Sequence, residues 1–382
     1  MRNQIKCIVL IVLLSNCEQK SKSLESESAN KLLNYDAEAS AQIILDEETS
    51  LVSRLNKKIT LDQKEKLLIF SSLINGFKIY DIESQNIEQT IKFPVTGPNA
   101  VNGMEFGSGI HFVNKDTVIL FSQDYASFYL ANLQGEIYKK IKLMNDSISF
   151  GATALVSPLA YRKGSVYIQS LPKYPVGKEV EIKKQLSLKK IDLESGVVSN
   201  VAFPTPKIYL DKRYSQSFNA FDIVYNSNLD KFIVSFPLSD SLYLIDASGS
   251  YDKILAKSKL VDEYQEFNED FKEIPISQLD SYFQWISDSY GALYYDEVNN
   301  RYIREAKSGI SKEDFLERKL KPKKELMILD ENFNQLGTYQ HDGSGILYTF
   351  YKDRTFYFNK DLRKFNLDVG NEDTLYFDRI KY

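Results

Sequence analysis

One stretch of the chain, residues 221–258, reads FDIVYNSNLDKFIVSFPLSDSLYLIDASGSYDKILAKS and decides the fold. Four short runs of β-branched and aromatic residues alternate in it with clusters of Asn, Asp, Ser, Gly and Pro, which is the pattern of strands joined by turns. The predicted strands are residues 221–225, 231–236, 241–245 and 251–256. The stretch therefore predicts a four-stranded antiparallel meander.

Two markers indicate that this unit recurs along the chain. An Asp or Asn closes the third strand of five units, where its side chain can accept hydrogen bonds from the following turn. These residues are Asp81, Asn132, Asp192, Asp246 and Asp330. Small residues cluster where the first strand of a unit begins, at Gly109, Ala152, Ala220, Ala292 and Gly345. With a first unit over residues 51–93, the chain divides into six units, and repeats of about 40–50 residues with four strands are typical of β-propellers.

The last unit runs out of chain before a clear fourth strand. Residues 41–45, AQIIL, lie outside the first unit and could supply that strand, which would close the ring and remove open sheet edges. Strands 231–236 and 242–245 are apolar on both faces, as expected of sheets that pack between neighbouring sheets. The sequence therefore predicts an all-β fold over residues 35–382: a six-bladed β-propeller with four-stranded antiparallel blades, closed by an N-terminal strand.

The N-terminus is expected to be an export signal rather than part of the fold. Arg2 and Lys6 precede an apolar run over residues 7–14, which is much shorter than the roughly 20 residues that span a bilayer. The run ends in LSNC, which resembles the bacterial lipoprotein box with Cys17 as the acylated residue. This predicts a signal peptide over residues 1–16 and a flexible polar tether over residues 17–34. An ordinary signal peptide with an incidental cysteine is the alternative.

Composition excludes several kinds of chemistry. The formal net charge of -4 and the lack of a basic run argue against nucleic acid. The only cysteines are Cys7 and Cys17, so the mature domain has no disulfide, zinc thiolate or cysteine nucleophile. His111 and His341 have no partner at metal-binding spacing, and the sequence contains no phosphate loop, nucleophile elbow or HExxH motif. We therefore predict no metal site formed by His or Cys and no cofactor, although carboxylates could still bind Ca²⁺.

The longest connections are residues 257–290, 172–185 and 307–323, and the propeller topology places all three on one face. In the first of them, DEYQEFNEDF and ISQLDSYFQWIS are expected to form short helices. Tyr282, Trp285 and Tyr290 are candidate ligand-binding residues, as an aromatic lip over the axial channel. A small satellite core under a long loop is the alternative interpretation.

Three acidic residues precede predicted inner strands on the same face. Glu105, Asp288 and Asp342 could converge at the channel mouth, where they would act as catalytic carboxylates or bind Ca²⁺. Carboxylates of solvated turns are the alternative.

Several segments resemble a known family. They are the export signal with Cys17, FPVTGPN at residues 93–99, VSFPLSDSLYLID at residues 234–246 and ILDENFNQLG at residues 328–337. They are similar to the DUF4221 family of Bacteroidetes lipoproteins, which in turn resembles the TolB-like six-bladed propellers. The resemblance implies a propeller on the cell envelope and brings no established activity with it.

The leading functional hypothesis is a binding or scaffolding module for a protein or glycan. It would be a monomer, lipid-anchored at Cys17 to the outer membrane, on the periplasmic side or the cell surface. An alternative is a propeller enzyme of the hydrolase, lyase or lactonase type that uses the channel-mouth carboxylates. A third is a purely structural spacer.

Overall fold

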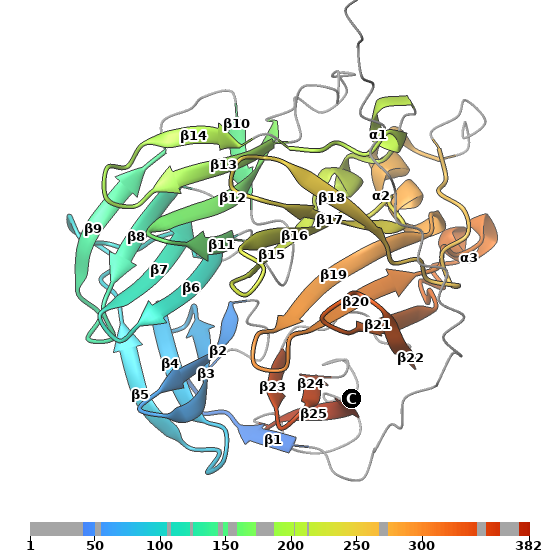
Figure 1. Cartoon of the computed structure of the whole chain (residues 1–382). Helices are drawn as coiled ribbons and strands as arrows, with labels where there is room; N and C mark the ends of the chain where they lie inside the picture. Colours follow the sequence, from blue (N-terminus) through green and yellow to red (C-terminus); the bar gives the residue numbers. More distant parts are fainter. Residues whose placement is uncertain are drawn as a thin grey trace, which may run out of the picture.

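The strands surround a common axis in a ring of six sheets (Figure 1). The structure is a computed structural model. It describes residues 41–49, 55–104, 108–122, 125–143, 148–151, 159–172, 187–201, 203–211, 214–266, 274–341, 349–359 and 374–382. Within these residues the predicted all-β, six-bladed propeller is confirmed.

The blades follow one another in chain order, each running from its inner to its outer strand. Blade 1 contains β2 (Asn56–Leu61), β3 (Lys64–Ser71), β4 (Gly76–Asp81) and β5 (Ile87–Lys92). Blade 2 contains β6 (Gly109–Asn114), β7 (Thr117–Ser122), β8 (Ser127–Ala131) and β9 (Ile137–Lys142). Blade 4 contains β15 (Asp222–Asn226), β16 (Lys231–Ser235), β17 (Ser241–Ile245) and β18 (Tyr251–Leu255). Blade 5 contains β19 (Ser289–Asp296), β20 (Arg301–Lys307), β21 (Lys324–Leu329) and β22 (Gln335–His341).

Blade 3 departs from the regular pattern, because its inner strand is in two pieces. β10 (Ile148–Gly151) and β11 (Leu159–Arg162) pair with successive parts of β12 (Ser165–Pro172). The sheet continues with β13 (Ser187–Asp192) and β14 (Val198–Val201). The sequence predicts one strand from Ala152, which lies outside the described residues.

Blade 6 is closed by the N-terminal part of the domain. β23 (Thr349–Lys352), β24 (Thr355–Asn359) and β25 (Thr374–Lys381) come from the end of the chain, and β1 (Ala41–Ile44) pairs antiparallel with β25. Ala41 lies opposite Phe377 and Ile44 opposite Thr374. The predicted closing strand is therefore confirmed, and it covers what would otherwise be an open edge of β25.

The hydrophobic core is divided into one cluster at each of the six blade interfaces. At the interface that closes the ring, Ile43 of β1 and Phe350 of blade 6 share a cluster with Leu67 and Tyr80 of blade 1. All residues of β4, β8 and β17 are buried, because a middle strand packs against a blade on each side. Each fully buried large apolar side chain contributes about 1.5–3 kcal/mol, so six such interfaces stabilise the ring without a disulfide.

The Asx residues form the turns that the sequence predicts. Oδ1 of Asp246 accepts hydrogen bonds from the backbone N–H groups of Ser248 (2.8 Å) and Ser250 (3.1 Å). The same acceptor role is found at Asp81, Asn132, Asp192 and Asp330. These side chains fix the turn between the third and fourth strands of five blades.

Two ends of the blades differ in their connections. We call one the turn face; it carries the short links between first and second strands, at residues 62–63, 115–116, 163–164, 227–230, 297–300 and 353–354. The opposite end carries the short helices α1 (Ile208–Asp211), η2 (Gln216–Asn219), α2 (Ile276–Ile286) and α3 (Lys312–Leu316). No helix among the described residues is long and apolar enough to cross a membrane.

The predicted placement of long connections on one face is confirmed for two of the three. α2 lies between blades 4 and 5, α3 lies between β20 and β21, and the two helices contact each other. The third predicted connection, residues 172–185, falls outside the described residues apart from Pro172. The helix expected over ISQLDSYFQWIS is α2, whereas residues 262–266 of the other expected helix are not helical. A further connection on this face, residues 202–221, carries α1 and η2 and was not predicted from the sequence.

Candidate functional site

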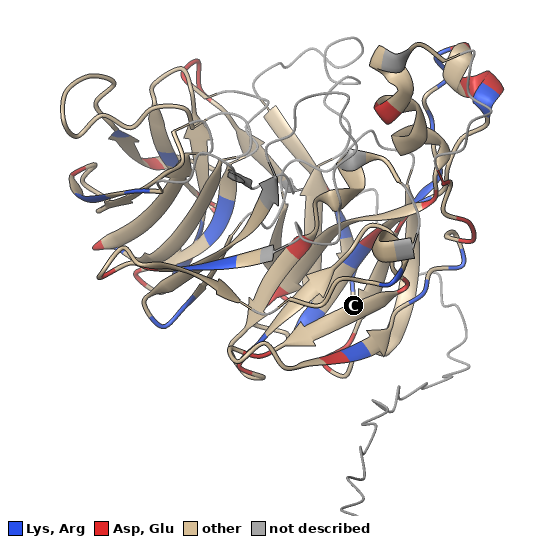
Figure 2. Ribbon diagram, turned by 90° about the horizontal axis from the view of Figure 1, so that it is seen from above, with Lys and Arg blue, Asp and Glu red and all other residues tan. Residues whose placement is uncertain are grey.

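The helices at the end opposite the turn face form one structural unit. We define the insertion platform as the described residues of the connections 203–221, 256–288 and 308–323. Figure 2 shows α2 and α3 standing out from the sheets; α2 carries one charged residue, Asp280, whereas α3 carries Lys312, Glu313 and Asp314. α2 is central, because it contacts both η2 and α3.

Side chains of α2 hold the platform together. The Asp280 carboxylate accepts hydrogen bonds from the hydroxyls of Ser215 (2.6 Å) and Ser217 (2.7 Å), which join α2 to η2. On the other side, the rings of Tyr282 and Phe315 meet edge to face with 5.0 Å between their centroids. Ile274, Tyr282 and Phe283 are buried together, and Leu279, Ile286 and Phe315 pack against them. The platform therefore has a small satellite core of its own, separate from the blade interfaces.

Asp288, one of the three predicted channel-mouth carboxylates, joins two of the connections. Its carboxylate accepts the backbone N–H groups of Asp262 (2.7 Å), Glu263 (2.9 Å) and Gly309 (2.7 Å). Both oxygens are thus used to hold the loop before blade 5 against the loop before α3. Glu105 and Asp342 lie outside the described residues, so the convergence of three carboxylates stays a prediction.

Tyr290 attaches the base of the platform to the ring. Its buried ring lies 3.4 Å from the guanidinium carbon of Arg304, and its hydroxyl donates to Asp240 (2.9 Å). The hydroxyl also accepts the N–H of Ser258 (3.0 Å). Burial and the neighbouring Asp240 raise the pKa of Tyr290, although the nearby Arg304 acts in the opposite direction. Tyr290, like Tyr282, is packed inside the protein.

Trp285 is the one predicted aromatic residue that is partly exposed. The Lys307 ammonium lies 5.8 Å from the centroid of its ring, and it donates a hydrogen bond to the carbonyl of Gln284. Burial lowers the pKa of Lys307 to about 8, and Lys324 adds to this shift by charge repulsion. Lys324 itself pairs with Glu305 at 2.8 Å. Ligand binding by Trp285 stays a prediction.

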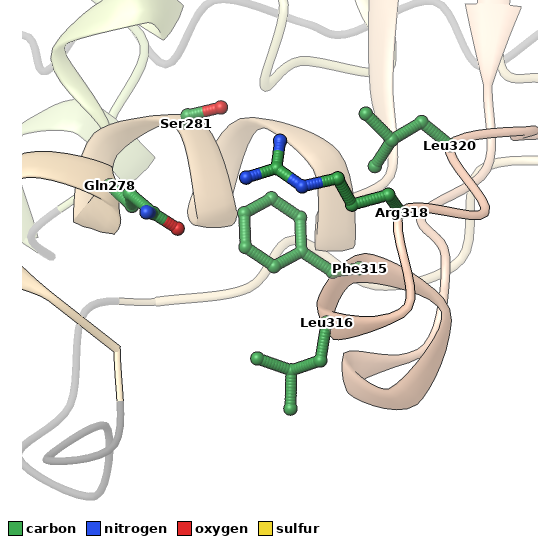
Figure 3. A pocket seen from close by; sticks show the side chains of 6 residues that line it. All are labelled: Gln278, Ser281, Phe315, Leu316, Arg318 and Leu320. Carbon is green, nitrogen blue, oxygen red and sulfur yellow. The ribbon is translucent and has the colours of Figure 1, made fainter.

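A pocket of about 240 Å³ lies between α2 and α3 (Figure 3). The lining residues are Gln278, Ser281, Phe315, Leu316, Arg318 and Leu320. Gln278 and Ser281 come from α2, and the others come from α3 and the residues that follow it. Figure 3 shows the Arg318 guanidinium directed towards α2, above the ring of Phe315. The pocket therefore combines polar groups, one cation and an apolar floor.

The inner strands place basic groups around the axis of the ring. Lys57 of β2 is accessible to water, and desolvation by the surrounding protein lowers its pKa. Burial lowers the pKa of His111 to about 3, and the charge of Lys57 adds to this effect. The His111 ring lies 5.2 Å from that of Tyr161. His111 is thus neutral at physiological pH.

In the described part of the chain, no group of three or more His, Cys, Asp or Glu residues could hold a metal ion. Cys17, the predicted lipidation site, lies outside the described residues. The Arg318 pocket was missed at the sequence level, and the motif Ser311-x-x-Asp314 was the available signal. Ser311 caps α3, because its hydroxyl accepts the N–H of Asp314 at 3.0 Å.

Comparisons with known proteins identify the family and the fold. The family model "Domain of unknown function (DUF4221)" matches residues 33–338. The crystal structure of a DUF4221 member from Bacteroides vulgatus ATCC 8482 superposes with a TM-score of 0.72 at 18% identity, covering 92% of this chain and 99% of that one. A Bacteroides fragilis NCTC 9343 structure named "putative exported protein" gives a TM-score of 0.52 at 12% identity, covering 93% and 97% of the two chains. No curated protein sequence matches the chain at a significant level.

Proposed function

Because this chain belongs to the DUF4221 family, whose model matches most of the propeller, we propose that it is a non-catalytic binding module of the cell envelope whose partner docks on the insertion platform. The observation that carries the proposal is the platform itself. Three separate connections build one packed unit with its own core and a pocket, on the same face of the ring. Rigid scaffolds that present loops and helices in this way are typical of binding proteins.

The bonding of Asp288, the one predicted channel-mouth carboxylate among the described residues, supports binding rather than catalysis. Both of its oxygens accept backbone N–H groups. A catalytic acid or base must instead be free to reach the substrate. Turnover of a substrate that disappears in Glu105→Gln or Asp342→Asn would favour the enzyme alternative.

We further propose that the protein is exported and lipid-anchored through Cys17. The short apolar run followed by LSNC supports this, and one similar structure carries a name that describes export. Metabolic labelling with a fatty acid should mark the wild-type chain and leave Cys17→Ala unlabelled. Equal labelling of the two chains would contradict the anchor.

Site-specific photo-crosslinking tests where the partner binds. A photoreactive residue would replace Leu316 on the platform or, as the control, Val298 on the turn face; both side chains are exposed, at 54% and 79%. In cells of the native host, we expect position 316 to give a discrete crosslinked product and position 298 to give none. A discrete product from position 298 alone would contradict docking on the platform.

A further inference from the structure

The guanidinium of Arg318 lacks an anionic partner in the described part of the protein. It makes no ion pair and no side-chain hydrogen bond with any described residue. Two acidic residues close to it in the sequence have other partners. Glu317 pairs with Lys319 at 2.6 Å, and Asp314 accepts the hydroxyl of Ser311 at 3.0 Å. The pocket thus contains an uncompensated positive charge.

The backbone at Arg318 adopts a conformation that favours glycine. Its φ is +58°, and it directly follows the last turn of α3. The N–H of Arg318 bonds to the carbonyl of Phe315 (3.1 Å), and that of Lys319 to the carbonyl of Asp314 (2.7 Å). This is the Schellman motif, in which glycine usually occupies the left-handed position. The chain therefore carries an arginine where a glycine would be less strained, and this conformation directs the guanidinium into the pocket (Figure 3).

The lining of the pocket limits the kind of group that fits. Its volume of about 240 Å³ is below the roughly 300–1,000 Å³ of sites for drug-sized ligands, so it suits one small residue or acid. Phe315, Leu316 and Leu320 offer an apolar floor, while Ser281 and Gln278 offer hydrogen-bonding groups beside the cation. Arginine binds carboxylates through two parallel hydrogen bonds. Two leucines suit an aliphatic or aromatic side chain better than a sugar.

We propose that the Arg318 pocket binds a carboxylate attached to a small apolar group, such as the C-terminal residue of a partner protein or a free hydrophobic acid. The inference rests on the proposed function, because it assigns a ligand chemistry to the platform. Arg318 pairs with the carboxylate, the apolar group packs on Phe315, Leu316 and Leu320, and the polar groups of α2 bind the adjoining amide.

Binding of a matched pair of probes to the full chain tests the proposal. N-acetyl-leucine carries the carboxylate and the apolar side chain, and N-acetyl-leucinamide has the same shape without the charge. By isothermal titration calorimetry, we expect the acid to bind at least about tenfold more tightly than the amide. The amide cannot form the charged hydrogen-bonded pair with the guanidinium. Equal binding of acid and amide, or no saturable binding of the acid up to about 10 mM, overturns the proposal.

Variants of two arginines distinguish a loss of binding caused by removal of the cation from one caused by a change in folding. Arg318→Gly removes the guanidinium and leaves a residue suited to the left-handed backbone, so it should fold and bind the acid at least about tenfold more weakly. Arg318→Lys should bind with intermediate affinity, because an ammonium cannot form the two parallel bonds. Arg354→Gly is the matched control: Arg354 is exposed, has a φ of +55° and lies on the turn face. Binding by Arg318→Gly equal to that of Arg354→Gly overturns the assignment.

Two further experiments identify the source of the carboxylate and test the carboxylate site and partner docking independently of each other. A pentapeptide that ends in leucine with a free carboxylate should bind more tightly than N-acetyl-leucine if the source is a protein C-terminus, and no more tightly if it is a free acid. If the crosslink from position 316 persists in Arg318→Gly, the carboxylate does not come from the docked partner, and docking on the platform stands. If the acid binds through Arg318 and position 316 gives no crosslink, docking of a partner fails and the carboxylate site stands.

Discussion

The two faces of the ring satisfy their polar side chains in different ways. On the turn face, side chains reach across from blade to blade. Arg162 of blade 3 forms two parallel hydrogen bonds with Asp230 of blade 4, at 2.6 and 2.7 Å. On the insertion platform, side chains bond within the platform or to its base, and the guanidinium of Arg318 has no ion-pair partner among the described residues. The comparison is consistent with the proposal that a partner binds on the platform, while contacts on the turn face join neighbouring blades.

Contacts of this kind occur near the turn face at all six blade interfaces. The pairs, from the interface of blades 1 and 2 onward, are Gln89 with the carbonyl of Leu133, Lys139 with the carbonyl of Glu194, Arg162 with Asp230, Asn226 with Asn300, Tyr382 with Asp296, and Lys352 with Glu83. Short turns make this possible, because they hold side chains of adjacent blades close together. Because these contacts join neighbouring blades near the turn face, the opposite face can carry insertions.

The largest expected effect comes from Arg304 of blade 5, which joins blade 4 and the base of the platform to its own blade. Arg304 is fully buried, and its guanidinium donates to Ser235, Phe236, Ser239 and the carbonyl of Ala256. Arg304→Met would leave these acceptors buried without a donor, so we expect it to lower the free energy of unfolding by about 3–5 kcal/mol. Chemical denaturation of the purified protein measures the change.

Arg301→Met, in the same strand, is the control for this substitution. Arg301 forms a partly exposed ion pair with Glu331, so its replacement should cost about 1 kcal/mol or less. Equal destabilisation by the two variants would show that Arg304 does not hold blade 4 and the base of the platform in the way its hydrogen bonds indicate.

An intermediate effect is expected on the turn face. Asn226 is fully buried; its amide donates to Asn300 (3.0 Å) and Tyr302, and its carbonyl oxygen accepts the N–H of Leu229 (3.0 Å). Asn226→Ala removes these partners, and we expect it to cost about 1–3 kcal/mol in the free energy of unfolding. The variant should bind N-acetyl-leucine like the wild type. Loss of binding in Asn226→Ala would contradict the idea that the turn face stabilises the ring and the platform binds the ligand.

The ring was predictable from the sequence because its signals are local. The turn at Asp246, for example, depends on a side chain and the backbone within four residues of it, and such turns recur in phase. The closing strand was predictable for a related reason: the last unit lacked one strand and residues 41–45 were unassigned. In blade 5, however, the predicted start at Ala292 came three residues late. The strand begins at Ser289 and passes through an irregularity between Tyr290 and Leu293.

The pocket was not predictable, because it depends on contacts between segments far apart in the chain. Phe315 lines it while packing on Tyr282, and none of the described residues forms an ion pair with Arg318, whereas the neighbouring Glu317 pairs with Lys319. Periodicity carries no information about either event. The aromatic residues singled out from the sequence lie elsewhere: Tyr282 and Tyr290 are buried, and only Trp285 is partly exposed. Aromatic content alone does not distinguish packing from binding.

The smallest expected effect tests the idea that Arg318 is present for binding rather than stability. Arg318→Gly changes the free energy of unfolding in two opposite ways. Relief of strain in the left-handed backbone stabilises the folded variant by about 1–2 kcal/mol. The greater chain entropy of glycine in the unfolded state destabilises it by about 0.5–1 kcal/mol. We expect the free energy of unfolding to rise by about 1 kcal/mol or less, and Arg354→Gly to behave alike, because its φ is similar. Chemical denaturation of both variants measures this. A loss above about 2 kcal/mol in Arg318→Gly alone would mean that the guanidinium already has a partner inside the protein, since an exposed, unpaired arginine has no such stability to lose.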